Sequence, residues 1–242
     1  MSLSIPEIRQ LADVSNPSSF SNRMRFRRFQ LFESLIATLP RPLRILDVGG
    51  TNLFWENRDW VNRDDIQIVT LNLQAEPKSF SNIESVIGDA TDLSQFADAS
   101  FDIVFSNSVI EHLFTLENQR RMAAEVQRVG KAIWVQTPNF WFPIEPHFLV
   151  PGWQWLPTEV RVRLIRRWRC GHRGPCTEPV RARQLVTEVR LMTRAELRQA
   201  FPGADLVPER FLGLAKSWVV IYGFPLDLQG RPKLNLHNLG NR

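Results

Sequence analysis

The stretch Arg44-Ile45-Leu46-Asp47-Val48-Gly49-Gly50-Thr51 decides the expected fold. Its apolar run at residues 45–48 predicts a short buried strand with an acidic residue near its end. Two glycines follow at once, and after them comes a stretch that can begin a helix. Because glycine lets the backbone pass close to a bound molecule, this strand, turn and helix are typical of a nucleotide-cofactor pocket.

The same turn excludes two common nucleotide sites. No third glycine follows Gly50 at the spacing of G-x-G-x-x-G, and no Lys-Ser/Thr pair marks a phosphate-binding P-loop. The carboxylate of Asp47, two positions before Gly49, suits a cofactor with a cationic or hydroxyl-rich end, and S-adenosylmethionine is such a cofactor. An ordinary strand–turn–helix corner of an α/β domain is the alternative at this point.

Four further stretches predict strands, at residues 66–71, 86–90, 101–107 and 131–137, with a helical pattern at 119–129. Short apolar strands that alternate with helices indicate an α/β protein with a doubly wound parallel sheet, whose ligands bind at the carboxyl edge. Polar residues stand at or near the ends of four strands and would gather at that edge: Asp47, Asn72, Asp89 and Asn107.

Together these stretches resemble the class I S-adenosylmethionine-dependent methyltransferases, specifically the type 11-like small-molecule group. The matching segments are ILDVGG (45–50), VTLNL (69–73), IGDATDL (87–93), FDIVFSNSVIEHL (101–113) and EVQRVGKAIWVQTPN (125–139). Residues 190–211 and 217–224 look like that fold's final helix and reversed strand pair. The resemblance implies a mostly parallel seven-stranded Rossmann-like sheet with a reversed last strand, S-adenosyl-L-methionine as cofactor, and methyltransferase activity.

The resemblance also implies which residues would surround the cofactor. The glycine turn and the end of the fourth strand would both hold the methionine end of the cofactor. The end of the second strand would bind the ribose, and the end of the third strand would bind the adenine. In chain order the residues are Asp47, Gly49, Gly50 and Thr51, then Asn72 and Leu73, then Asp89 and Ala90, then Asn107 and Ser108. This chain departs from the family where Thr51 and Leu53 replace glycines and where Asn72 replaces the usual ribose-binding acid.

An insertion at residues 140–189 follows the fifth strand and therefore begins at the catalytic edge. Its first stretch, Phe140-Trp141-Phe142-Pro143-Ile144-Glu145-Pro146-His147-Phe148, mixes four aromatic residues with one acid and one histidine. We expect a cap over the acceptor site, where aromatic faces can meet a cation. The alternative is that the aromatic residues only pack the insertion onto the domain.

Methyl transfer to oxygen benefits from a general base, and imidazole titrates near neutral pH. The candidate catalytic residues are His147, Glu145 and His112. The pair Glu111-His112 could instead support its loop. Some members of the resembled family bind a metal through an extra acid three residues before this pair, but Ser108 stands there in this chain. The cluster Cys170-x-His172-x3-Cys176 offers only three ligands, so we predict no metal site in the chain.

The expected division of the chain has five parts. Residues 1–43 form an N-terminal segment with a lid or packing helix at 22–39, and residues 44–139 form the cofactor-binding core. Residues 140–189 form the aromatic and arginine-rich cap, and 190–228 complete the core with a helix and a strand pair. Residues 229–242, like the first 21, are expected to be loosely ordered.

The composition of the chain indicates the cellular compartment in which we expect the protein. The chain has 242 residues, 43% of them hydrophobic, two cysteines and a formal net charge of +5. A sparse cysteine content, no apolar leader after Met1 and no long apolar run favour a cytoplasmic protein without a membrane span.

The acceptor is expected to be a small molecule or a glycan or lipid precursor, methylated at oxygen. Eleven arginines against four glutamates in residues 157–199 favour an anionic or lipid-linked acceptor, or peripheral contact with an anionic membrane. A solvated basic helix is the alternative there. Other readings of the chain are a tRNA or protein methyltransferase and an inactive binding module on an anionic surface. No nucleic acid is predicted as a partner, because no RNA-binding motif accompanies the charge.

Overall fold

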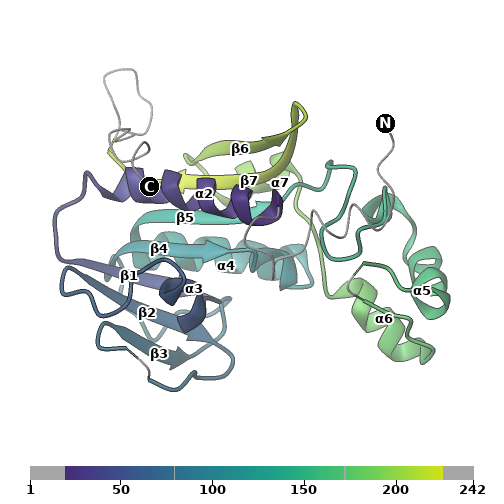
Figure 1. Ribbon diagram of the computed structural model, residues 1–242, viewed down its shortest axis with the longest axis horizontal. Coiled ribbons are helices and arrows are strands. Elements are labelled where there is room, and N and C mark those ends of the chain that lie inside the picture. Colours follow the sequence, from purple (N-terminus) through teal and green to yellow (C-terminus); the bar gives the residue numbers. More distant parts are fainter. Residues whose placement is uncertain (1–19, 79, 172, 226–242) are drawn as a thin grey trace.

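Seven strands pair in the order β3-β2-β1-β4-β5-β7-β6 in the computed structural model, which describes residues 20–78, 80–171 and 173–225 (Figure 1). The strands are β1 (Leu43–Val48), β2 (Ile66–Asn72), β3 (Ile83–Ile87), β4 (Phe101–Asn107), β5 (Gly130–Pro138), β6 (Asp205–Phe211) and β7 (Leu214–Tyr222). Strands β1 to β5 are parallel, and β7 runs antiparallel to both β5 and β6. The predicted parallel sheet with a reversed last strand is therefore confirmed.

Helices cover both faces of this sheet. They are α2 (Phe20–Ile36), α3 (Asn52–Glu56), α4 (Leu116–Val129), α5 (Thr158–Arg167), α6 (Pro179–Thr187) and α7 (Arg194–Ala200), with short 3-10 helices η1 (Ile110–His112) and η2 (Trp153–Trp155). Helices α2 and α3 lie on one face, α4 and α7 lie on the other, and α5 and α6 form a lobe beside the sheet (Figure 1).

The strands read as continuous apolar runs because both of their faces are buried. Successive side chains alternate between the two faces. Ile45 joins the cluster under α2, which contains Phe32 and Trp134, whereas Leu46 joins the cluster under α4 with Val126. Two packed apolar layers thus hold the sheet, and its carboxyl edge is left free for a site.

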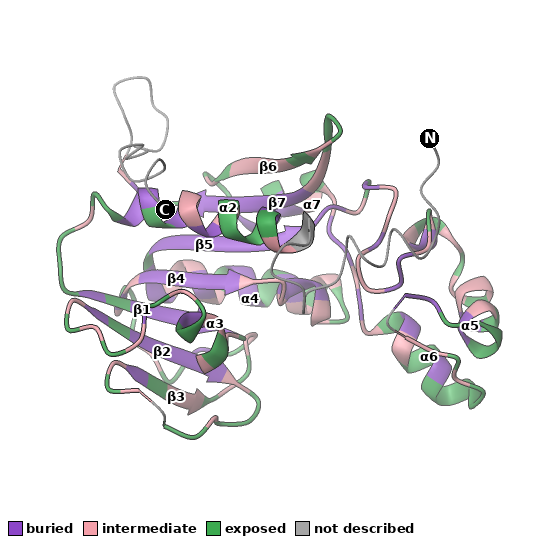
Figure 2. Cartoon of the chain, in the orientation of Figure 1, coloured by how far each residue is buried: buried purple, intermediate pink, exposed green. Residues whose placement is uncertain are grey.

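The insertion has an apolar cluster of its own. Phe148 and Trp153 are fully buried and stack with ring centroids 4.3 Å apart, and Ile165 of α5 packs with Val186 of α6 in the same cluster. Buried segments are visible in both helices in Figure 2. Part of the aromatic content of the insertion therefore packs the lobe, while Trp141 is 63% exposed.

Three boundaries differ from the predictions. The third strand covers Ile83–Ile87 rather than residues 86–90, because it is a half-exposed edge strand with no continuous apolar run. Helix α2 ends at Ile36, three residues before the predicted Leu39, where Pro40 approaches. Strand β5 includes Pro138, which was expected to stop it and instead faces Ser217 of β7.

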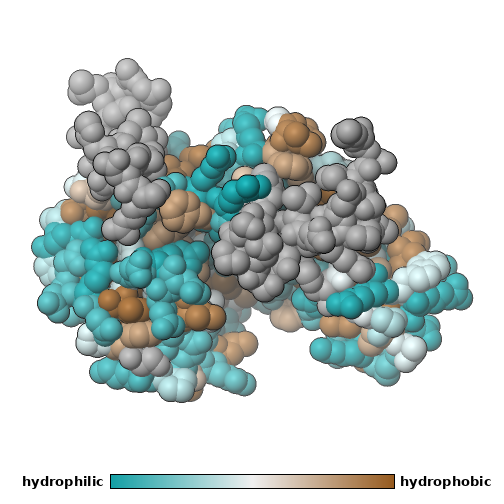
Figure 3. All heavy atoms as spheres, in the orientation of Figure 1, coloured by the Kyte–Doolittle hydropathy of each residue, from teal (hydrophilic) through white to brown (hydrophobic). Residues whose placement is uncertain are grey.

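The apolar side of α5 is also corrected. Helical spacing in the sequence predicts that Trp168 shares an apolar side with Val160, Leu164 and Ile165, but Trp168 lies just past the helix and is 59% exposed, in a lobe whose surface mixes hydrophilic and hydrophobic residues (Figure 3). Val162 is buried in its place. Within the described ranges, no helix is both long and apolar enough to cross a bilayer. The tail predicted at 229–242 lies outside the described residues.

The turn after β1 yields a matched pair of glycine substitutions. Gly49 and Gly213 have φ of +80° and +82°, but an added Cβ would meet Val109 Cγ2 at 2.5 Å at Gly49 and nothing within 4 Å at Gly213. Alanine at either position costs roughly 1–2 kcal/mol for the left-handed backbone. We expect Gly49→Ala to lower the free energy of unfolding by about 1–3 kcal/mol more than Gly213→Ala, from overpacking. Urea unfolding checks this, and equal costs for the two variants would contradict the close approach.

Candidate functional site

The carboxylate of Asp47 is buried directly behind the glycine turn. The residue is 1% exposed, and its Oδ2 accepts a hydrogen bond from Trp55 Nε1 at 2.7 Å. A Cβ added to Gly50 would lie 1.6 Å from the same oxygen, so only glycine fits there. Asp47 thus supports the turn from behind, and the backbone of the turn is what faces outward.

Neighbouring strands hold the turn in place. The Gly49 amide donates to the Leu71 carbonyl at 2.8 Å, and Asn72 Nδ2 donates to the Gly50 carbonyl at 2.7 Å. Thr51 caps α3 by accepting from the Phe54 amide. Because Asn72 uses its N–H₂ group in this bond, its carbonyl oxygen is the atom it can offer to a ribose hydroxyl.

The edge beyond Asn72 exposes apolar side chains where the adenine was predicted. Leu73 is 78% exposed and Ile87, the register partner of Asn72, is 64% exposed. Asp89 follows in a loop, where its Oδ1 accepts from the amide and hydroxyl of Thr91. A glycine turn, an amide at the ribose position and an exposed apolar edge fit a nucleoside cofactor such as S-adenosylmethionine.

The end of β4 is tied to helix α2. Arg28 Nη1 donates to Asn107 Oδ1 at 2.7 Å, and the same guanidinium makes two hydrogen bonds to Glu209 of β6. Ser108 has a φ of 61°, and its hydroxyl donates to Gln136 Oε1 at 2.8 Å. Sequence reasoning missed Arg28, although the arginine-rich start of the helix was visible.

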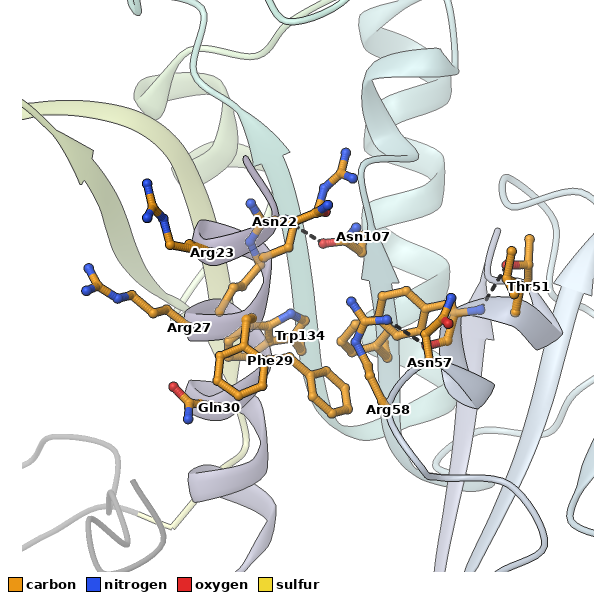
Figure 4. A pocket seen from close by; sticks show the side chains of 16 residues that line it. Asn22, Arg23, Arg27, Phe29, Gln30, Thr51, Asn57, Arg58, Asn107 and Trp134 are labelled. Atoms are coloured by element: carbon orange, nitrogen blue, oxygen red, sulfur yellow. Dashed lines mark hydrogen bonds between the residues drawn. The ribbon is translucent and has the colours of Figure 1, made fainter. Parts of the chain in front are cut away.

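A cavity of about 950 Å³ lies between α2 and the glycine turn (Figure 4). Its walls include Thr51 and Leu53 from the turn and Asn107 from β4. Phe29 and Trp134 are aromatic lining residues of the same cavity. The cavity therefore joins the predicted cofactor edge to the N-terminal helix.

The three predicted catalytic residues also lie together. His147 Nδ1 donates to Glu145 Oε1 at 2.5 Å, and the rings of His112 and His147 meet edge to face with centroids 4.9 Å apart. Glu145 is 1% exposed, and its Oε2 accepts from the amides of His147 and Phe148. Residues 35 positions apart in the chain are thus brought into one cluster by the insertion.

Glu111 is the fourth member of this cluster. It is fully buried, its Oε2 accepts from Thr137 Oγ1 at 3.0 Å, and its Oε1 has no hydrogen-bond partner among the described residues. Burial raises the pKa of Glu111 to about 7. Burial, together with the charges of His147 and Arg173, lowers the pKa of His112 to about 4.

His147 differs from His112 because of its carboxylate partner. Burial lowers its pKa, but the hydrogen bond to Glu145 and the charge of Glu145 outweigh burial, so that its pKa is raised overall. Near pH 7, His112 is therefore neutral, whereas His147 is the better proton acceptor of the two. Its Nε2 is the nitrogen that Glu145 does not engage.

Glu111, His112 and His147 each offer one ligand atom, and these atoms lie within 4.8 Å of one another. Among the described histidines, cysteines and carboxylates, these three residues are close enough together to bind one metal ion. Their ligand atoms could hold a divalent cation. The prediction of no metal site rests on Ser108, which stands where some members of the resembled family have an extra acid, and on the three ligands of the cysteine cluster; it stays a prediction.

The structure therefore gathers the predicted residues into two groups. The cofactor residues share the carboxyl edge, with Ala90 packed against the apolar layer under α4. The candidate bases share the cluster next to the insertion. Which of them contact a ligand stays a prediction, and Trp55 and Arg28 are site-forming residues that the sequence patterns did not single out.

Part of the chain matches a known domain family. Residues 61–132 match the model of a methyltransferase domain. An uncharacterized protein of Mycobacterium tuberculosis is 32% identical over 78 residues, which is 32% of this chain and 26% of that protein. The chain thus aligns with about a quarter of the length of the curated relatives it matches.

Solved structures share the fold at low identity. The CurJ carbon methyltransferase has a TM-score of 0.53 at 11% identity, covering 90% of this chain and 57% of the other. A Rhodobacter sphaeroides protein provisionally assigned to the zinc-dependent alcohol dehydrogenases has a TM-score of 0.51 at 11% identity, covering 80% and 88%. At this identity, both likenesses show the Rossmann-like fold alone.

The buried carboxylate of Asp47 predicts a pH-dependent stability. Burial raises its pKa from 3.8 to about 7, partly countered by the Trp55 hydrogen bond. A carboxyl group whose folded pKa is raised stabilises the fold at low pH, and this stability is lost as the pH rises toward 7. We expect the wild type to lose about 3 kcal/mol more than Asp47→Asn between pH 5 and 8.

Urea unfolding at both pH values measures this difference. Asp64→Asn is the matched control, because Asp64 is exposed. Parallel pH profiles for the wild type and Asp47→Asn would contradict the burial of an uncompensated carboxylate.

The absence of a metal is tested by chelation. If no metal binds at Glu111, His112 and His147, treatment with EDTA leaves the unfolding temperature unchanged, and elemental analysis finds no stoichiometric metal. A lowered unfolding temperature that Mn²⁺ or Zn²⁺ restores, and that His147→Ala abolishes, would overturn the prediction.

Proposed function

We propose that the chain, whose residues 61–132 match a methyltransferase domain, is a class I S-adenosylmethionine-dependent methyltransferase that transfers a methyl group to an oxygen of a small-molecule or glycan/lipid-precursor acceptor. The cofactor supplies a methyl group already activated by a positive sulfur. The protein's task is then to align the acceptor, exclude water and remove a proton.

The chain offers a suitable edge for this cofactor. The backbone of Gly49 and Gly50 faces outward because Asp47 and Trp55 fill the space behind it. Asn72 would accept from a ribose hydroxyl, and Leu73 and Ile87 would cover the adenine. The departure from the family at Asn72 removes one negative charge, so we expect weaker ribose binding than a carboxylate would provide.

The Glu145–His147 pair beside His112 is the observation that supports an oxygen atom as the methyl acceptor. Nε2 of His147 can take the hydroxyl proton, while Glu145 holds Nδ1 and stabilises the resulting imidazolium. His112, with its pKa lowered to about 4, does not compete for that proton near pH 7. A nitrogen acceptor would have less need of such a pair.

The lobe of α5 and α6 would limit water at this cluster. Its apolar cluster contains Phe148, the residue after His147, so that the loop bearing the base is anchored in the lobe. Contact of the lobe with an anionic membrane, and action on tRNA or protein, stay open alternatives. We know of no residue arrangement in the described ranges that favours them over a small acceptor.

Cofactor binding is the direct test of the family assignment in this chain. We expect S-adenosylhomocysteine to bind in isothermal titration calorimetry, and NAD(H) and NADP(H) not to bind. Gly49→Val should abolish binding, since a branched side chain would collide with Val109. Retained affinity in folded Gly49→Val protein would place the cofactor elsewhere.

Proton removal is tested at His147. With a panel of hydroxyl-bearing acceptors, His147→Ala should lower the rate of S-adenosylhomocysteine formation roughly 100-fold or more, the usual effect of losing a general base. The affinity for S-adenosylhomocysteine should change little. Trp155→Phe, in the same segment and half exposed, is the control. If His147→Ala reduces stability and activity together, the pair is structural instead.

A further inference from the structure

The cavity beside the glycine turn has strongly cationic walls. Five arginines line it, and no aspartate or glutamate does: Arg23, Arg25, Arg27, Arg28 and Arg58. The first four come from α2 and the fifth from the segment after α3. In Figure 4, Arg23 and Arg27 extend to the side of α2 away from Arg58, whereas the charges of Arg25 and Arg28 act on Arg58. Aromatic rings, including Phe29 and Trp134, and uncharged polar residues such as Asn107 form most of the remaining wall.

Most of this charge has no acidic partner. In residues 20–78, 80–171 and 173–225, Arg28 is the one of the five that forms an ion pair, with Glu209 at 2.7 Å. Arg28 is also held by Asn107, so it is a fixed part of the wall. Among the described residues, the other four form no ion pair, although Arg58 is held by the Phe54 carbonyl and by aromatic rings.

Arg58 is held in a defined orientation. Its Cζ lies 3.6 Å from the centroid of the Phe54 ring and 4.9 Å from that of Phe29, and its Nη1 donates to the Phe54 carbonyl at 2.6 Å. A stacked guanidinium loses little freedom when it binds an anion, because its plane is already fixed. Arg58 is therefore a prepared donor.

The arginines also repel one another. Burial and then the charge of Arg25 lower the pKa of Arg58 to about 10, although Asp47 opposes this. Burial and the charge of Arg28 lower the pKa of Arg25. Like charges held together in this way destabilise the empty wall, and an anion placed between them would relieve the repulsion.

We propose that this cavity binds the anionic group of the methyl acceptor, a phosphate or a carboxylate, between Arg25 and Arg58. The assignment to the acceptor rests on the proposed function, since a positively charged sulfur is disfavoured beside unpaired arginines unless an anion accompanies it. The segment from Asn107 to His112 runs from the cavity to the base cluster, so an acceptor anchored here could extend toward His147.

The arginines of the insertion suit this role less well. Arg163, Arg166 and Arg167 are exposed on or at the end of α5. Arg25 is exposed as well, so the difference between the two sets is not exposure: the α5 arginines do not line the cavity, and within the described residues none of them stacks on a ring as Arg58 does. Arg163 is therefore a good control, with the same charge but without the cavity.

The test uses the full chain and measures two affinities in parallel by calorimetry at constant ionic strength. The first probe is pyrophosphate, with citrate as the carboxylate arm, and the second is S-adenosylhomocysteine. The variants are Arg25→Gln, Arg58→Gln and the double variant, with Arg163→Gln as control. Arg25→Gln alone is informative if Arg58→Gln fails to fold, since Arg25 takes no part in the aromatic stack.

We expect the wild type to bind at least one anion and the tighter of the two to identify the acceptor's group. The double variant should weaken that binding about tenfold or more, and Arg163→Gln should leave it unchanged. The affinity for S-adenosylhomocysteine should stay within about threefold of the wild type, because neither Arg25 nor Arg58 is among the residues predicted to contact the cofactor.

Two results would overturn the proposal. One is that the wild type binds neither anion, or that the double variant binds them as tightly as the wild type does. The other is a loss of S-adenosylhomocysteine binding as large as the loss of anion binding, which would assign the arginines to the carboxylate of the cofactor. Failure of the wild type to bind S-adenosylhomocysteine would instead contradict the proposed function, and the anion measurements would still stand.

Discussion

One buried carboxylate, that of Asp47, sets the geometry of the carboxyl edge. It receives the Trp55 indole N–H, and it lies so close to Gly50 that no side chain fits there. The second position after β1 must therefore be glycine, and the backbone must turn outward at the place where a cofactor would lie. Because Asn72 binds the carbonyl of the same turn, a change at Asp47 would reach the end of β2 as well.

Much of the fold follows from periodicity. The buried strands β1, β2, β4 and β5 carry apolar runs on both faces, and the sequence located each of them within two residues. The edge strand β3 was placed three residues late, because an edge strand buries only one end and loses the apolar signal. Trp168 was assigned to a buried face for a related reason: helical spacing shows which residues share a side, but not where the helix ends.

The site was less predictable than the fold. Motif order located the cofactor edge, yet nothing local reveals that His147 meets His112, because their contact depends on how the insertion folds back. Arg28 illustrates the same limit, since its partners Asn107 and Glu209 lie 79 and 181 positions away. Charge in the sequence pointed to the insertion, whereas the arginines that line a cavity lie mainly in α2.

Helix α2 joins these features into one unit. Its apolar side packs on the sheet through Phe32, and Arg28 ties its other side to both β4 and β6. A cationic cofactor on one wall and an anionic acceptor against the arginines would then share a single rigid frame. Opposite charges in such a frame raise each other's affinity by the same factor, because coupling between two sites is reciprocal. The repulsion among the unpaired arginines destabilises the empty protein. Because an anionic acceptor relieves this repulsion and attracts the cationic cofactor, each ligand binds more tightly when the other is already present.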